Sequence, residues 1–332
     1  MGEFVVADRV SRQSQVVNQE LLENTVVNIC GDDVASDLVH LGLIGLNVKG
    51  IVRKEQGPLF DTLAVDTKKL NYFQEAKTDG NYDYVICSKK EYSVKNNRLT
   101  FPRNNSYLAG MVAGRTLNAL VRSIEQKDAI LTEDNVESID RKVSQKVLVV
   151  GAGGTGTYTA ISALIAGYDV CVIDQDTIET SNFNRQVLYG GRQGEYKSEV
   201  LSQALNPLGN IEGVVGLIQD NKKLLSTYKD SIVFSCVDNT DTRIFLDEQR
   251  DEQGYTLIDT GTGPSNGRVH VAQNQSLQEQ VVLIPEKKAS CVLAAPSVVM
   301  PNMVVGSLAV HSAISKSQKP ILYRGLNNEV VF

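Results

Sequence analysis

Tryptophan is absent from this chain of 332 residues, and proline (8) and cysteine (5) are scarce. The cysteine count is odd and no CxxC pair occurs, which argues against a disulfide framework and a zinc site. Basic residues are outnumbered, because 33 Lys and Arg against 39 Asp and Glu leave a net charge of −6. The chain therefore lacks the basic footprint of a protein that binds nucleic acid or membrane surfaces.

Long apolar stretches are also missing. No run approaches the ~20 apolar residues that cross a bilayer, and the first residues do not show a basic region followed by an apolar run, the pattern of a signal peptide. We therefore expect a soluble, cytoplasmic protein. Hydrophobic residues nevertheless make up 42 % of the chain, which is typical of globular proteins. The length favours two domains of ordinary size.

One segment in the middle of the chain predicts a βαβ unit. Residues 146–176 read as an apolar strand, a glycine-rich turn, an amphipathic helix and a second apolar strand that ends in acids. Such a turn brings the N–H groups at a helix start close to a phosphate. The turn contributes the candidate nucleotide-binding glycines Gly151, Gly153, Gly154 and Gly156.

Further strands are expected around 231–241, 255–263, 267–273 and 280–286, followed by a closing helix. The first part of the chain resembles a worn copy of this unit. Residues 24–52 align without gaps on residues 146–174, and Gly31 corresponds to Gly153. A repeat this long indicates a duplicated domain.

The first copy has lost its phosphate-binding glycines. Ile29, Asp32 and Val34 stand where the second copy has glycine, and the carboxylates of Asp32 and Asp33 would repel a phosphate. We therefore predict an α/β protein with two Rossmann-like doubly wound sheets. Residues 1–143 would form a degenerate, inactive lobe, and residues 144–332 an active ATP-binding domain.

Polar motifs follow the second copy in a fixed order. They are DQD at 174–176, SNFNRQ at 181–186, GEYK ending at Lys197, and DNTDTR at 238–243. This ordered set resembles the ThiF/MoeB/HesA family, which shares the adenylation fold of ubiquitin-activating enzymes. The resemblance covers about 147–315, and the degenerate first half looks like the inactive partner subunit of heterodimeric members. It implies an enzyme that uses ATP and Mg²⁺ to activate a carboxylate as an acyl-adenylate.

The resemblance also implies a role for each matched residue. Asp174 would accept hydrogen bonds from the ribose hydroxyls, while Asn182 and Gln186 would position the nucleotide. Arg185 and Lys197 would neutralise the phosphates. Asp238 would hold Mg²⁺.

Two further residues are assigned by resemblance. Arg12 matches an N-terminal arginine that reaches the neighbouring subunit's phosphates in dimeric relatives; here the neighbour could be the second half of the same chain. Cys291 lies in the crossover loop where some relatives carry a thioester-forming cysteine and is a possible nucleophile, but a relic without a catalytic role is the favoured interpretation. Ala294 replaces the second cysteine of a zinc pair, so no structural zinc is expected.

Several polar residues outside this set favour structural roles. Asp176 could be a turn acid or a ligand, whereas Asp241 and Arg243 are expected to form a structural pair at a helix start. The three histidines, His40, His270 and His311, match no motif and are expected to pack as ordinary side chains.

The leading interpretation is an adenylyltransferase that acts on a peptide or small protein. The lack of a separate catalytic-cysteine domain favours the maturation of a ribosomally made peptide into an antibiotic-like product. Activation of the C-terminus of a ubiquitin-like or sulfur-carrier protein stays open, and so does a non-catalytic scaffold that binds a peptide. Two fused lobes could satisfy the family's dimer interface internally, although a homodimer of whole chains also stays open.

Overall fold

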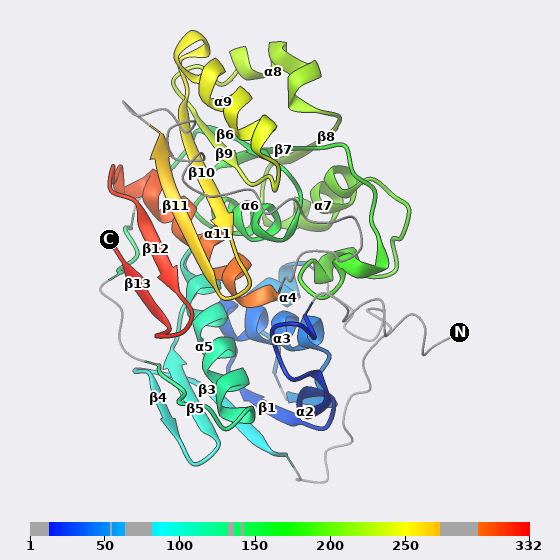
Figure 1. The fold of residues 1–332 in the computed structure, drawn as a ribbon, viewed down its shortest axis with the longest axis vertical. Coiled ribbons are helices and arrows are strands. Elements are labelled where there is room, and N and C mark those ends of the chain that lie inside the picture. Colours follow the sequence, from blue (N-terminus) through cyan, green and yellow to red (C-terminus); the bar gives the residue numbers. More distant parts are fainter. Residues whose placement is uncertain (1–12, 54, 64–81, 132–135, 141–142, 273–297) are drawn as a thin grey trace.

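The computed structural model describes residues 13–53, 55–63, 82–131, 136–140, 143–272 and 298–332. Within these residues the strands form two sheets, both dominated by parallel pairing. Figure 1 shows the smaller sheet at the bottom and the larger one at the top, with α3 (Val34–Leu46), α5 (Ala109–Ile124) and α11 (Val299–Ser315) between them. The expectation of two doubly wound α/β sheets is thus confirmed.

The smaller sheet has the order β2-β1-β3-β5-β4. Its first four strands are parallel neighbours, and only β4 runs antiparallel to β5. Its strands are β1 (Val26–Cys30), β2 (Gly50–Arg53), β3 (Tyr84–Lys89), β4 (Ser93–Lys95) and β5 (Arg98–Pro102). Two short helices, α2 (Gln19–Glu23) and α4 (Pro58–Leu63), complete this lobe in the described residues.

The larger sheet has the order β13-β12-β11-β10-β9-β6-β7-β8. The five strands from β10 to β8 are parallel, and β11, β12 and β13 extend the sheet by antiparallel pairing. The strands are β6 (Lys146–Val150), β7 (Asp169–Asp174), β8 (Ile211–Val215), β9 (Ile232–Ser235), β10 (Thr256–Thr262), β11 (Asn266–Ala272), β12 (Ile321–Arg324) and β13 (Glu329–Val331). The strand expected at 280–286 lies outside the described residues.

The helices of the second lobe follow the expected alternation. They are α6 (Gly154–Ile165), α7 (Lys197–Leu205), α8 (Lys222–Ser226) and α9 (Thr240–Gln253), with 3-10 turns η1 (Thr180–Asn182), η2 (Val187–Tyr189), η3 (Asn206–Leu208) and η4 (Ile218–Asn221). Because consecutive parallel strands need a crossover, the helices lie against the sheet faces and the strands are buried runs such as VLVV in β6. The carboxyl ends of β6, β7 and β9 therefore meet at one edge.

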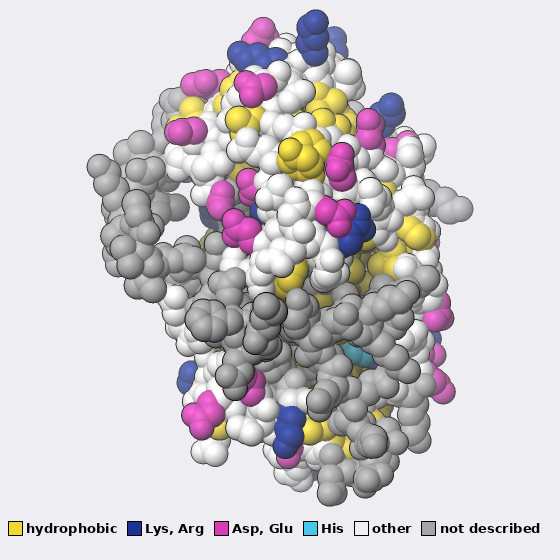
Figure 2. Space-filling view, turned by 90° about the vertical axis from the view of Figure 1, so that its right-hand side faces the viewer, with side chains coloured by type: hydrophobic (Ala, Val, Ile, Leu, Met, Phe, Trp, Pro, Cys, Tyr) yellow, Lys and Arg dark blue, Asp and Glu magenta, His cyan; other side chains and the backbone are white. Residues whose placement is uncertain are grey.

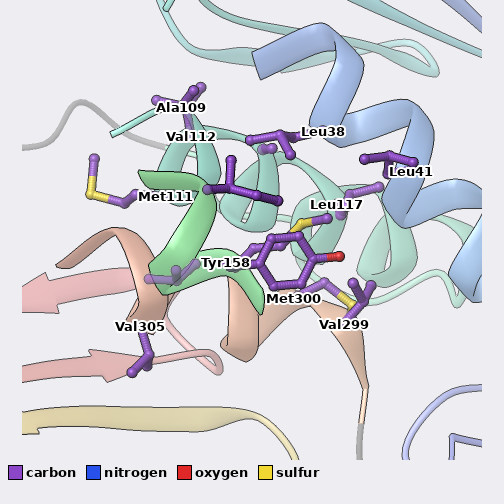
Figure 3. Close-up of a cluster of buried hydrophobic side chains, with 14 of the residues drawn as sticks. Leu38, Leu41, Ala109, Met111, Val112, Leu117, Tyr158, Val299, Met300 and Val305 are labelled. Carbon is purple, nitrogen blue, oxygen red and sulfur yellow. The ribbon is translucent and has the colours of Figure 1, made fainter. Parts of the chain in front are cut away.

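The hydrophobic core runs continuously from one lobe to the other. Figure 3 shows side chains of α3, α5, α6 and α11 meeting around the buried ring of Tyr158. The Tyr107 hydroxyl of the first lobe lies 3.2 Å from His311 Nδ1 on α11, and α5 packs directly against α11. The two lobes are therefore joined by packed helices.

The hairpin of β12 and β13 forms a second link between the lobes. Arg115, on α5, has no exposed surface, and its Nε donates to the Asn328 carbonyl over 2.8 Å. The Asn328 side chain donates back to the Arg115 carbonyl over 2.9 Å, and Asn118 donates to the Gly325 carbonyl over 2.8 Å. A buried arginine with these partners fixes the hairpin turn on the first lobe.

The surface carries no concentration of one charge on the face shown in Figure 2, where acidic and basic side chains are scattered over both lobes. Among the described residues, no helix is both long and apolar enough to span a bilayer. The domain boundary at 143/144 falls between α5 and β6; the division into an inactive and an active domain stays a prediction.

Candidate functional site

The glycine turn links β6 to α6 and needs glycine at two positions. Gly151 has φ +98°, and a Cβ there would lie 2.8 Å from the Cys236 carbonyl oxygen. A Cβ on Gly156 would collide with the Gly151 carbonyl. Gly153 caps α6 without a side-chain hydrogen bond to the first turn. The N–H groups at the start of α6 are thereby open to an anion.

Asp174, the last residue of β7, holds this turn in place. Its Oδ2 accepts a hydrogen bond of 2.6 Å from the Ala152 N–H, and its Oδ1 accepts one of 2.7 Å from the Asp176 N–H. Burial raises the pKa of Asp174, although both of these bonds act in the opposite direction. Each carboxylate oxygen keeps a second lone pair that could accept from a ligand hydroxyl.

The segment after β7 contributes an arginine and a glutamine. The Arg185 guanidinium donates to the Ser181 carbonyl over 3.1 Å and to Asn184 Oδ1 over 3.0 Å. The side chain of Gln186 is almost completely buried, and its Oε1 has no hydrogen-bond partner. Because this oxygen is shielded from solvent, it does not face the open cavity, and Gln186 contributes to the cavity wall through its other atoms.

Asn182 behaves differently from the expectation that it faces the nucleotide. Its Oδ1 accepts from the Glu179 N–H over 3.0 Å and completes a reciprocal capping box at η1. In this position it shapes the loop that carries Arg185. It is absent from the cavity wall described below.

Lys197 is the first residue of α7 and lies near the carboxyl ends of the parallel strands, beside the residues that follow β7. Its Nζ lies 2.8 Å from Asp176 Oδ2, with 9 % of the lysine side chain and 59 % of the aspartate side chain exposed. Asp176 thus forms an ion pair, so the structure gives it a partner that the sequence did not suggest. The ammonium is held at the cavity by a carboxylate that stays largely in water.

Asp238 and Asn239 follow β9. Asn239 caps α9 by accepting from the Thr242 N–H over 2.8 Å, while Asp238 is exposed at the cavity wall. The expected pair of Asp241 with Arg243 is wrong. Arg243 instead forms an ion pair with the fully buried Asp259 of β10 and donates to the Thr260 carbonyl over 2.6 Å. A buried strand carboxylate offers a stronger partner than an exposed one on the first turn.

These residues surround one cavity of about 980 Å³. It contains most of the sequence-predicted residues, namely Gly151, Gly153, Gly154, Asp174, Arg185, Gln186, Lys197 and Asp238. Gly156 lies behind the wall, at the close contact with Gly151. Arg12 and Cys291 lie outside the described residues. None of the three histidines lines this cavity in the described part of the chain.

The cavity also includes residues that the sequence did not single out. Asn302, on α11, accepts from the Thr155 hydroxyl over 2.9 Å and donates to the Val298 carbonyl over 2.6 Å. Arg268, on β11, donates to Asp259 Oδ2 over 3.0 Å. In the sequence, Asn302 is a single polar amide in the first turn of a helix of mostly apolar and small residues, and this contrast could have identified it. Arg268 gives no signal in the sequence, because its position depends on the hairpin register.

The residues present suit a magnesium ion that is bound together with phosphates. Asp238 supplies a hard carboxylate oxygen on the cavity wall. No group of three or more His, Cys, Asp or Glu side chains that could hold a metal occurs among the described residues. A single carboxylate fits an ion whose remaining ligands are phosphate oxygens and water, as Mg²⁺ prefers.

The corresponding position in the first lobe already holds a carboxylate. Asp33 caps α3 and accepts from the Ser36 N–H over 3.2 Å and from the Asn104 N–H over 2.6 Å. Asp32 forms an exposed ion pair of 3.0 Å with Arg103. An incoming phosphate would meet these carboxylates instead of open N–H groups, which supports the prediction of a non-binding lobe.

The residue after Arg12 is well fixed. Gln13 has no exposed surface, and its amide donates to the Leu46 carbonyl at the end of α3 over 3.1 Å and to Gln19 Oε1 over 2.7 Å. The described chain therefore begins against the C-terminal end of α3.

The fold and the site together define an α/β protein with a polar, phosphate-compatible cavity at the carboxyl ends of its parallel strands. Residues 105–327 match the model of the ThiF family. The chain belongs to this family.

Curated relatives agree with this membership. A sulfur carrier protein adenylyltransferase of Thermus thermophilus is 32 % identical over 205 residues, which are 57 % of this chain and 74 % of that protein. A molybdopterin-synthase adenylyltransferase of Haemophilus influenzae is 29 % identical over 150 residues, 44 % of this chain and 62 % of that protein. SUMO-activating enzyme subunit 2 of Dictyostelium discoideum is 26 % identical over 165 residues, 47 % of this chain and 25 % of its own length.

Among solved structures, Escherichia coli MccB with ATP is similar to this chain. It shows a TM-score of 0.45 and 18 % identity, and the likeness covers 56 % of this chain and 62 % of that one.

Proposed function

We propose that this protein is an ATP-dependent adenylyltransferase that activates a carboxylate of a peptide or small protein. In this reaction a carboxylate oxygen attacks the α-phosphorus of ATP, the bond from that phosphorus to the bridging oxygen of pyrophosphate breaks, and an acyl-adenylate forms as pyrophosphate leaves. One observation carries the proposal: a single cavity gathers the glycine turn, four cationic side chains and three carboxylates. Family membership and the names of the relatives support it.

The cavity offers a partner for each part of ATP. The open N–H groups at the start of α6 and the cations of Arg185 and Lys197 suit the phosphates. Asp174 suits the ribose hydroxyls, and the side-chain amide of Gln186 on the cavity wall suits a polar group of the nucleotide. Asp238 would hold Mg²⁺, which neutralises phosphate charge when it is bound.

The Lys197–Asp176 pair suits a site that must exchange anions. The ammonium is nearly buried and would be costly to leave without a partner, while the exposed carboxylate of Asp176 can return to water. Asp176 therefore keeps Lys197 at the cavity until a phosphate takes its place.

The substrate class follows from the relatives. Because the matched proteins are named for sulfur-carrier and SUMO activation, we propose a small carrier protein, activated at its C-terminal carboxylate, as the first substrate to test. Maturation of a ribosomally made peptide remains the alternative. Both substrates would present a main-chain or side-chain carboxylate to the same α-phosphorus.

Arg12, placed by resemblance, would act on the phosphates of the second lobe as an arginine in cis. Gln13, its neighbour, is anchored at the end of α3, on the side of the first lobe that faces the loop of Arg185. Capture of the acyl-adenylate by the Cys291 thiol is a further step of the proposal, and a search for a thioester on Cys291 tests it.

The test is substrate-dependent exchange between ATP and labelled pyrophosphate. We expect exchange with either a small carrier protein or a precursor peptide, and the substrate that triggers it identifies the class. Arg185→Ala should abolish exchange while Arg192→Ala, a change to a surface arginine paired with Glu195, should leave it unchanged. Failure of the protein to bind ATP at all would favour a peptide-binding scaffold instead.

A further inference from the structure

The first lobe contacts the active-site loop through α3. Gly45, in the last turn of α3, faces the segment 184–187 of the second lobe. A Cβ on Gly45 would lie 2.7 Å from the Asn184 carbonyl oxygen and 3.2 Å from Val187 Cγ2. Because real Cβ atoms do not come within 3 Å of a backbone oxygen, α3 can approach the backbone of Asn184 this closely only because residue 45 has no side chain.

The touched segment carries two side chains of the cavity. Asn184 Oδ1 accepts a hydrogen bond of 3.0 Å from Arg185, and Gln186 follows at once. Tyr189, at the end of η2, extends the connection, since its buried hydroxyl donates to the Ala152 carbonyl in the glycine turn. A shift of a few tenths of an ångström at Asn184 would therefore move the arginine that faces the phosphates.

The end of α3 is itself rigid. Every residue of α3 is buried, and Asn47 ends the helix in the left-handed region with its N–H bonded to the Ile44 and Leu43 carbonyls. The Leu46 carbonyl accepts from the buried Gln13 side chain over 3.1 Å. The surface against which Asn184 rests is thus held by its own helix, its cap and the N-terminal segment.

We infer that the first lobe, through Gly45 of α3, positions Arg185 and Gln186 for nucleotide binding. Gly45 is a positioning residue, because it acts through the backbone of Asn184 and contacts no ligand. This inference rests on the proposed ATP site, and it gives a lobe without a phosphate-binding turn a function in catalysis.

Gly45→Ala tests the inference, and Gly42→Ala is its matched control. Gly42 lies one turn earlier on the same buried helix, and a Cβ there would meet the Leu117 side chain and, at 3.2 Å, Met303 Cε. Those contacts are with movable side chains away from the cavity. Both variants should melt at lower temperature than the wild type. Only Gly45→Ala should weaken ATP binding in titration calorimetry by about tenfold or more and lower kcat for pyrophosphate exchange.

Hydrogen exchange separates failure of this inference from failure of the proposed function. Amides of residues 180–190 should exchange faster in Gly45→Ala than in Gly42→Ala, whether or not ATP binds. Equal amide hydrogen exchange, or equal ATP affinity, in the two variants would overturn the positioning role. The proposed function would still stand if the wild type binds ATP. A wild type that does not bind ATP would overturn the proposed function instead.

Val187→Ala examines the same contact from the second lobe if Gly45→Ala does not fold. It removes a methyl group that meets Gly45, so the segment should loosen, with faster amide exchange and ATP affinity lowered several-fold. Unchanged affinity and exchange in this variant would count against the inference.

Discussion

Lys197→Ala is expected to remove most of the adenylation rate and very little of the stability. The Lys197 ammonium lies at the cavity, 2.8 Å from the carboxylate of Asp176, and 9 % of its side chain is exposed. When the lysine is removed, Asp176 keeps its contact with water, because 59 % of its side chain is already exposed. An ion pair with so exposed a partner contributes about 0–1 kcal/mol to folding, so the melting temperature should fall by only a few degrees, roughly.

The expected loss of activity is larger because, in the proposed ATP site, a phosphate polyanion would replace Asp176 as the partner of Lys197. A unit charge pair about 4 Å apart is worth about 4 kcal/mol at an effective dielectric constant of roughly 20. Release of Lys197 from Asp176 offsets about 1 kcal/mol of this attraction. The remaining ~3 kcal/mol corresponds to a decrease of about 150-fold in kcat/KM.

The measurement is kcat/KM for ATP–pyrophosphate exchange, together with a thermal melt of each variant. Lys223→Ala, on the exposed side of α8, is the matched control and should behave as the wild type. A decrease of less than about threefold in Lys197→Ala, roughly 0.7 kcal/mol, would show that Lys197 does not meet the phosphates. A large decrease accompanied by a collapse of the melting temperature would assign it a structural role.

Three other changes have expected outcomes. Asp259→Asn should destabilise the fold by about 3–5 kcal/mol in urea titrations, because Arg243 and Arg268 lose their shared buried carboxylate; a loss under about 1 kcal/mol would mean that water replaces it. Arg12→Ala should cost about 2–4 kcal/mol in kcat/KM, and less than about 0.5 kcal/mol would make Arg12 an ordinary surface charge. Burial lowers the pKa of His40 to about 3, so the unfolded chain binds a proton below about pH 6.5 that the folded chain refuses. As the pH is lowered from about 6.5 towards 3, the free energy of unfolding should therefore decrease less in His40→Gln than in the wild type. An equal decrease between pH 7 and pH 5 in the two proteins, measured by urea titration, would contradict this account.

The parts of the fold that could be predicted are those fixed by local sequence. The apolar run of β6, the glycine turn and the acid at the end of β7 lie within 30 residues, so their geometry follows from one βαβ unit. Lys197 and Asp238 could also be placed, because each follows a turn at the carboxyl end of a neighbouring strand.

The parts that could not be predicted depend on contacts between distant segments. Asp259 reaches Arg243 only because β10 is paired beside β9. Asn302 meets Thr155 across 147 positions of sequence. Asn182 caps its own loop, because an asparagine three residues after the capping Glu179 can bond either the backbone or a ligand, and the loop conformation decides which.

The link between Arg115 and the turn of β12 and β13 has a consequence for synthesis of the chain. Arg115 leaves the ribosome 213 residues before Asn328, its acceptor. Until then its guanidinium lacks the two hydrogen bonds that it donates to the Asn328 carbonyl, although its side chain is fully buried in the finished protein. We therefore expect the first lobe to remain loosely packed during translation until the hairpin of β12 and β13 has been made, so that the two lobes mature together.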